Sequence, residues 1–113
     1  MDRKKQLKEQ YKQMKPDMGL IAIINNETNE HYLIPSQDTK AMINRIRFQL
    51  DLGGFKDRNI QKQWKNLGEH AFTIKVLEKL EYDKDESKTD YKEDLELLKS
   101  MWEEKLEKEN IKL

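Results

Sequence analysis

Residues 18–35 read Met-Gly-Leu-Ile-Ala-Ile-Ile-Asn-Asn-Glu-Thr-Asn-Glu-His-Tyr-Leu-Ile-Pro. The opening apolar run is rich in β-branched side chains and too short for a helix, so it predicts a strand. Residues 25–29 are polar, and their asparagines tolerate the backbone conformations of a tight turn. A second apolar run, residues 31–34, ends at Pro35, which lacks an N–H group and suits the end of a strand. The whole segment therefore predicts a β-hairpin.

Amphipathic helices are predicted on both sides of the hairpin. Before it, residues 3–15 place Leu7, Tyr11 and Met14 at helical spacing, and Pro16 ends this helix. After it, a helix begins at a cap provided by Ser36 or Asp38 and ends near Gly53-Gly54. The apolar face of that second helix is formed by Met42, Ile43, Ile46 and Leu50.

The remainder of the chain predicts a helix, a strand and a long helix. Asp57 caps the first of these helices and Gly68 ends it. Its apolar residues are Ile60, Trp64 and Leu67. Residues 72–80 alternate well enough for a third strand, on which Phe72, Ile74 and Val76 share one side. The charged residues 82–90 predict a mobile loop, and the last helix follows from about Asp90. Its apolar stripe is Leu95, Leu98, Trp102 and Leu106.

The predicted order αββααβα fits one small α+β domain. The chain has 113 residues, of which 35% are hydrophobic and 39% are charged, so a single small core is expected. We divide it into an N-terminal helix at residues 1–16, an α+β domain at residues 17–109 and a tail at residues 110–113.

Composition excludes several classes of function. The chain has no cysteine, which rules out disulfides, thiolate zinc sites and cysteine nucleophiles. It also lacks an apolar signal segment and a run long enough to span a membrane, so a cytoplasmic protein without a membrane partner is expected. The 22 basic and 22 acidic residues balance, but residues 1–67 carry a net charge of +5 and residues 68–113 a net charge of −5. This asymmetry indicates either a basic binding face or simply solvated helix surfaces.

The common catalytic motifs are missing from the sequence. The four glycines do not form a phosphate-binding P-loop, and no serine stands in a Gly-x-Ser-x-Gly elbow. His31 and His70 are far apart, without the spacing of a zinc site. No cofactor is expected on these grounds.

The hairpin and the segments after it resemble the GIY-YIG endonuclease family. The resemblance rests on Gly19-Leu-Ile and Tyr32-Leu-Ile on adjacent strands, followed by a capped helix. It continues through residues 45–50, 61–69 and 72–80, and extends over most of the chain, to about Leu106. It implies a three-stranded antiparallel sheet flanked by helices, and hydrolysis of phosphodiesters by tyrosines, an arginine and a metal-binding glutamate.

This chain departs from the family pattern at several site positions. Tyr32 matches the tyrosine of the second motif, but Ile21 stands in place of the first tyrosine and can neither donate nor accept a proton. Ile34 replaces the glycine of the second motif. The family's arginine falls on Met42, and Arg45 lies one helical turn later.

The last helix departs further. When the segments are matched at Trp102, the family's metal-binding glutamate falls on Lys99, whose ammonium would repel Mg²⁺. Glu96 and Glu103, one turn away on either side, could bind the metal only in a different helix register. No metal site is expected otherwise.

The resemblance and these departures predict a nuclease-like domain with impaired or lost catalysis that retains nucleic-acid binding. Tyr32 and Arg45 are the remnants of the catalytic set, and DNA is the expected partner. The candidate nucleic-acid-binding residues are Arg45, Arg47, Arg58, Lys62 and Lys65. Trp64 and Trp102 lie on apolar stripes and are expected in the core.

Two alternatives remain open at this stage. The first is a protein-interaction module that associates with itself or with another protein through the charged helices at residues 3–15 and 90–109. The second is an active endonuclease that uses Mg²⁺ or Mn²⁺ with an altered set of Tyr32, Arg45 and either Glu96 or Glu103.

Overall fold

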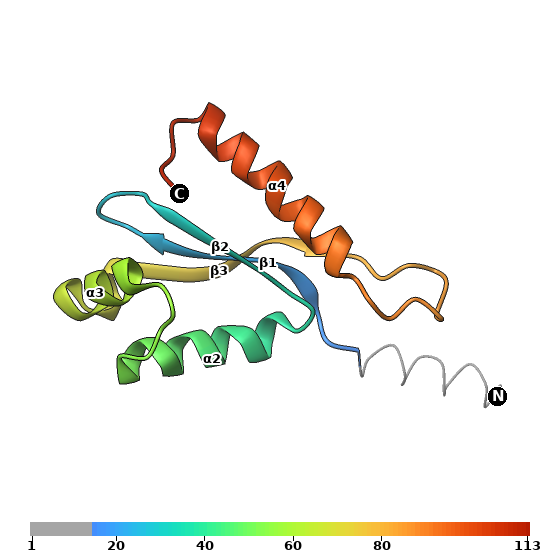
Figure 1. Ribbon diagram of the computed structural model, residues 1–113, viewed down its shortest axis with the longest axis horizontal. Coiled ribbons are helices and arrows are strands. Elements are labelled where there is room, and N and C mark those ends of the chain that lie inside the picture. The colour runs from blue at the N-terminus through green and yellow to red at the C-terminus, as the bar shows by residue number, and fades with distance from the viewer. Residues whose placement is uncertain (1–14) are drawn as a thin grey trace.

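A computed structural model describes residues 15–113, which fold into a three-stranded antiparallel sheet with helices on both faces (Figure 1). The elements are β1 (Met18–Asn25), β2 (His31–Ser36), α2 (Thr39–Leu52), α3 (Arg58–Leu67), the 3-10 helix η1 (Glu69–Ala71), β3 (Phe72–Leu80) and α4 (Lys92–Lys108). The predicted α+β class, antiparallel sheet and element order are confirmed within this range. The helix predicted at residues 3–15 lies outside the described residues, apart from its last residue.

Strand β1 is the centre of the sheet and is buried along its whole length. It pairs antiparallel with β2 on one side and with β3 on the other, in the order β2-β1-β3. Ile21 and Ile23 pack with α2 and α3, whereas Leu20, Ala22 and Ile24 pack with α4. The continuous apolar run in the sequence is thus explained by burial of both faces of one strand.

The two helical layers differ in composition. Helices α2 and α3 cover one face of the sheet, and α4 crosses the other face (Figure 1). The α2 and α3 layer contributes Ile46, Leu50, Ile60 and Trp64 to its core, and α4 contributes Leu98 and Leu106 to the other. No helix of residues 15–113 is long and apolar enough to cross a membrane.

A β-bulge changes the facing of β3 partway along the strand. Leu20 is opposite Glu78 whereas Ile21 is opposite Val76, so Leu77 is an extra residue in β3. Phe72 and Ile74 share one side of the strand as predicted and pack toward α2 and α3, whereas Leu77 packs toward α4. Val76, which was predicted on the same side as Phe72 and Ile74, lies opposite Ile21 and is 37% exposed.

Side-chain caps define the helix starts that the sequence predicted. Of the two candidates for α2, Asp38 is the cap, because its carboxylate accepts the Ala41 N–H at 3.1 Å. Ser36 instead accepts the Asp38 N–H through its hydroxyl. Asp57 caps α3 by accepting the Ile60 N–H at 3.1 Å.

The hairpin turn is tied to α3 through one buried side chain. Asn25 is only 2% exposed, and its carbonyl oxygen accepts the N–H groups of Glu27 and Thr28. Its amide nitrogen donates to Gln63 on α3 at 3.1 Å. Asn29 adopts the positive φ that the turn requires. The turn and α3 are therefore fixed relative to each other.

Gly19 is the position in β1 that cannot accept a side chain. A Cβ atom built there would overlap the backbone carbonyl oxygen of Glu78 on β3. We expect Gly19→Ala to lower the free energy of unfolding by about 2 kcal/mol, because overpacking a rigid backbone contact costs about 1–3 kcal/mol. Urea unfolding measures the change. Gly54→Ala is the control, since a Cβ there meets nothing within 4 Å. Equal stability of the two variants would contradict the prediction.

Candidate functional site

Tyr32 lies on the outer strand β2, where its ring is partly buried. It packs against the core of the α2 and α3 layer and meets the ring of Phe55 edge-on at a centroid distance of 5.8 Å. Burial, and secondarily the nearby negative charge of Asp57, raise the pKa of the Tyr32 hydroxyl above its ordinary value. At neutral pH the hydroxyl is therefore protonated and acts as a hydrogen-bond donor.

Ile21 occupies the neighbouring strand position as a core residue. It is fully buried and lies opposite Ile34 in the β1–β2 register, on the same face of the sheet as Tyr32. Both isoleucines pack in the α2 and α3 layer. At the position where the sequence comparison expected a tyrosine, the structure therefore has hydrocarbon packing and no proton-transferring group.

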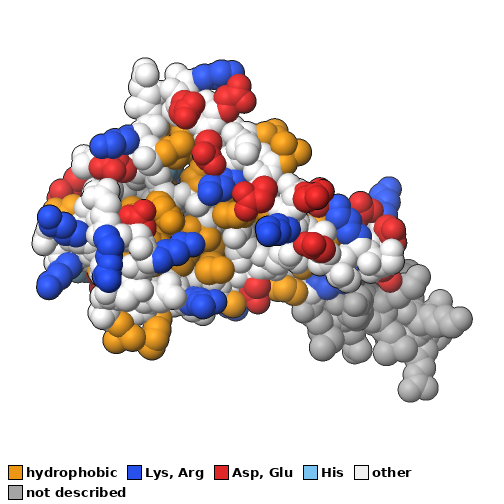
Figure 2. All heavy atoms as spheres, in the orientation of Figure 1, with side chains coloured by type: hydrophobic (Ala, Val, Ile, Leu, Met, Phe, Trp, Pro, Cys, Tyr) orange, Lys and Arg blue, Asp and Glu red, His pale blue; other side chains and the backbone are white. Residues whose placement is uncertain are grey.

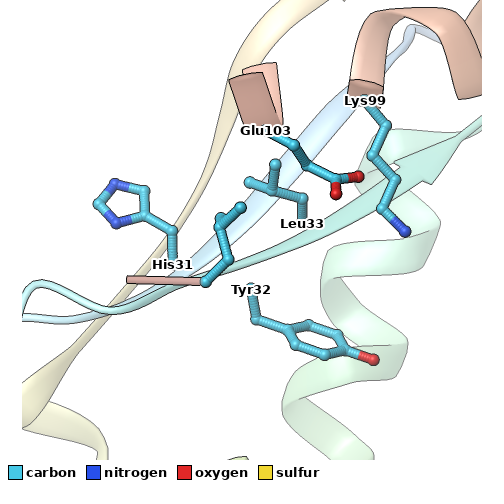
Figure 3. A pocket seen from close by; sticks show the side chains of 6 residues that line it. His31, Tyr32, Leu33, Lys99 and Glu103 are labelled. Carbon is cyan, nitrogen blue, oxygen red and sulfur yellow. The ribbon is translucent and has the colours of Figure 1, made fainter. Parts of the chain in front are cut away.

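A pocket of about 200 Å³ lies between β2 and α4. Its lining residues are His31, Tyr32, Leu33, Lys99, Glu103 and Leu113. Figure 3 shows that Lys99 and Glu103 extend from α4 toward β2, whereas the Tyr32 ring extends from the other side of this strand, toward the α2 and α3 layer. The chain's last residues border this pocket, because the His31 N–H donates to the Lys112 carbonyl oxygen at 2.8 Å.

The two acidic candidates on α4 lie in different places. Glu103 shares the pocket of Tyr32 and Lys99, whereas Glu96 lines a neighbouring hollow with Met42 and Pro35. Within residues 15–113, no three His, Cys, Asp or Glu side chains converge in a way that could hold a metal ion. Glu103, the carboxylate in this pocket, has the Lys99 ammonium as a pocket neighbour, so the pocket residues do not fit a divalent cation.

Arg45 and Arg47 lie on opposite flanks of α2. Residues two positions apart in a helix are separated by about 200° around its axis. Both arginines are exposed, on either side of the buried Ile46. Arg45 lies one turn after Met42 on the same flank of α2. Met42 lines the hollow that Glu96 also lines. The structure therefore does not place both arginines at one phosphate.

The remaining three basic candidates share one face of α3. Arg58, Lys62 and Lys65 are four and three residues apart, all exposed, and lie opposite the buried residues Ile60 and Trp64. We call these three residues the α3 basic stripe. In Figure 2, blue side chains gather over α3, whereas red ones are interspersed over α4. Among residues 15–113, no ion pair involves any member of the stripe.

Both tryptophans serve packing, as the sequence predicted. Trp64 is 7% exposed, stacks at a tilt against Phe72 and donates its indole N–H to Asp51 at 3.3 Å. Trp102, on α4, packs against the core between α4 and the sheet, and its indole N–H donates to Glu78 on β3 at 3.2 Å. The Trp64 ring is buried, and the partly buried Trp102 ring has the Lys105 ammonium 4.6 Å from its centroid.

Sequence reasoning missed the shared pocket of Lys99 and Tyr32. The spacing of Lys99 and Glu103 shows that they share a helix flank, but it does not show which strand this flank faces. It also missed two exposed apolar pairs, Phe48 with Leu52 on α2 and Leu97 with Met101 on α4. These pairs lie on outer helix faces, away from the pocket residues.

Comparison with known proteins identifies the fold. No family model matches the sequence, and no curated protein matches it closely. A solved structure of the catalytic domain of I-TevI, a GIY-YIG homing endonuclease, covers 80% of this chain and 88% of its own, with a TM-score of 0.64 and 21% identity. A variant of the catalytic domain of this intron endonuclease covers 61% of this chain and 70% of its own, with a TM-score of 0.53 and 25% identity. The chain therefore has a GIY-YIG-like fold.

The raised pKa of Tyr32 has a consequence for stability at alkaline pH. Because the unfolded tyrosine ionises first, the free energy of unfolding falls as pH rises above about 10 toward the folded-state pKa. In Tyr32→Phe the decrease in the free energy of unfolding that is due to Tyr32 should disappear. The decrease due to Tyr82, whose pKa is also raised by burial, should remain. Urea unfolding across the alkaline range measures both profiles. Identical pH profiles for the natural chain and Tyr32→Phe would contradict the assignment.

Proposed function

We propose that this chain is a nucleic-acid-binding domain on a nuclease-like fold, and that it has lost metal-dependent cleavage. The observation that carries the proposal is the α3 basic stripe, formed by Arg58, Lys62 and Lys65. Three exposed cations at helical spacing, without ion-pair partners in residues 15–113, present their charge to an external polyanion.

The fold supports nucleic acid as that polyanion. I-TevI is an intron and homing endonuclease, so the domain that this fold resembles acts on nucleic acid. Lysine and arginine side chains on one helix face contact phosphates of the backbone without reading the bases. Binding through the α3 basic stripe is therefore expected to depend on salt and to depend little on base sequence.

The distribution of charge directs the binding to one part of the surface. Residues 1–67 carry a net charge of +5, and the later residues, which include α4, carry −5. A duplex that approached α4 would meet its carboxylates, among them Glu96, Glu104 and Glu107, and would be repelled. A duplex that approaches α3 does not meet this electrostatic repulsion.

Loss of cleavage is inferred from the residues at the pocket and on β1. Ile21 supplies only packing where proton transfer would be required. Lys99 brings a positive charge to the pocket of Tyr32, where a catalytic metal ion would need carboxylates. Glu103 alone provides one such ligand there.

Removal of the α3 basic stripe should weaken binding and flatten its salt dependence. Replacing Arg58, Lys62 and Lys65 by glutamine removes three phosphate contacts, so the slope of log affinity against log salt should become less steep by about three. Fluorescence anisotropy with a short mixed-sequence DNA duplex at several salt concentrations measures the slope.

A charge-matched control comes from elsewhere on the surface. Lys79, Lys84 and Lys108 lie on β3, the 81–91 loop and α4, and their replacement by glutamine should leave affinity and slope unchanged. Lys79 and Lys108 make exposed ion pairs with Asp17 and Glu104, which contribute little to stability. Equal loss in both triple variants, or binding by the natural chain that does not depend on salt, would rule out the proposal.

Cleavage should be absent in the presence of divalent metal ions. Incubation of supercoiled plasmid with the natural chain and Mg²⁺ or Mn²⁺ should produce no nicked product, because the pocket lacks the ligands that a catalytic metal requires. The opposite outcome would be nicking that disappears in Tyr32→Phe and in either Glu96→Gln or Glu103→Gln. Glu104→Gln, on the far flank of α4, is the control for general loss of negative charge.

A further inference from the structure

Two exposed apolar pairs lie on helices that cover opposite faces of the sheet (Figure 1). The α2 pair is Phe48 with Leu52, the α4 pair is Leu97 with Met101, and all four side chains are between 59% and 70% exposed. We propose that the α2 pair of one copy of this chain docks on the α4 pair of a second copy, so that copies associate head to tail. This inference goes beyond the proposed function and does not depend on it.

Each pair forms one continuous apolar surface that faces away from the sheet. The two residues of each pair are four positions apart, which places them one above the other on a helix. Phe48 is about 200° around the axis of α2 from the buried Ile46, so its ring points outward. In Figure 2, hydrophobic side chains protrude beneath α2 and at the outer edge of α4. Removal of these surfaces from water favours association.

The two surfaces also fit each other in shape. Met101 borders a hollow of about 120 Å³, whose other lining residues are Glu78, Leu98, Trp102 and Lys105. We expect the Phe48 ring of the second copy to enter this hollow, because aromatic side chains that fill a pocket on a partner dominate the binding energy of interfaces. A protruding group and a hollow on different faces of one molecule produce a contact between unlike surfaces. Such a contact extends into a chain of copies unless it closes into a ring.

Charge favours contact between unlike surfaces over contact between identical ones. Helix α2 has three basic residues and one acidic residue, a net charge of +2, whereas α4 has four basic and six acidic residues, a net charge of −2. Two copies of the same helix would repel each other, whereas α2 and α4 attract. When the pairs pack antiparallel with Phe48 opposite Met101, Arg45 lies opposite Glu104, one turn further along. The exposed ion pair of Glu104 with Lys108 contributes little and does not prevent this contact.

The test blocks each surface in a separate variant. Phe48→Gln with Leu52→Gln removes the α2 pair, and Leu97→Gln with Met101→Gln removes the α4 pair. The replaced side chains are exposed, so both variants should keep the circular dichroism of the natural chain. Because one helix packed on another buries less than the roughly 1,200 Å² of stable complexes, the association is expected to be weak. Sedimentation velocity without nucleic acid is therefore measured from micromolar to millimolar concentrations.

The natural chain should form dimers and larger species as its concentration rises, and each blocked variant alone should stay monomeric. An equimolar mixture of the two variants should form a 1:1 pair and nothing larger, because one copy then offers only its α4 pair and the other only its α2 pair. The control, Leu67→Gln with Leu113→Gln, removes two exposed apolar side chains elsewhere and should associate like the natural chain.

Exchange of one charge pair tests the orientation of the helices. In Arg45→Glu, the dissociation constant should rise about tenfold, because like charges then face each other. The double variant that also carries Glu104→Arg should recover the association.

Several results would overturn the proposal. One is a natural chain that stays monomeric at millimolar concentration, and another is a mixture of the blocked variants that does not pair. Association of either blocked variant by itself would show that two identical surfaces meet. Equal loss of association in the control would show that the apolar contact is not specific to these two pairs.

Discussion

The burial of β1 on both faces is the constraint on which the rest of the structure depends. Every residue of Met18–Asn25 is buried, and both strand edges are paired. Such a strand needs a helical layer on each side and a partner strand at each edge, because its apolar side chains and its backbone hydrogen bonds would otherwise face water. Helix α4 meets one face, and α2 with α3 meet the other (Figure 1). Gly19 permits the close approach of β3 that completes the sheet.

This constraint decides where chemistry can occur in the domain. From Met18 to Ile24 this strand supplies the core of both layers and carries no polar side chain, which is consistent with the isoleucine at position 21. Polar groups can reach solvent only from the outer strands and from helix flanks. Tyr32 on β2 and Lys99 on α4 both line the pocket at such an edge, where α4 crosses the sheet. The candidate site therefore belongs to the sheet edge, while the centre of the sheet provides stability.

The sequence predicted the elements that local chemistry determines. The asparagine-rich turn, the aspartate caps at positions 38 and 57 and the apolar helix faces are all found, because each depends on residues only a few positions apart. The bulge at Leu77 was not predicted, since it is defined by the register with β1. Nor was the pocket of Lys99, because the flank of a helix that faces a given strand depends on the crossing of the two elements. That Lys99 occupies the position of the family's metal-binding glutamate stays a prediction.

The α3 basic stripe and the β2 pocket are mechanically connected through Phe55. This residue contacts the Tyr32 ring, and its N–H donates to Gln61 on α3 at 2.9 Å, while Gln61 donates to the Leu50 carbonyl oxygen of α2. Both hydrogen bonds are buried, so α3 cannot shift relative to Phe55 and α2 without breaking hydrogen bonds that water would not replace. The backbone of α3, which carries the exposed basic stripe, is consequently held in place against α2 and the loop that contains Phe55.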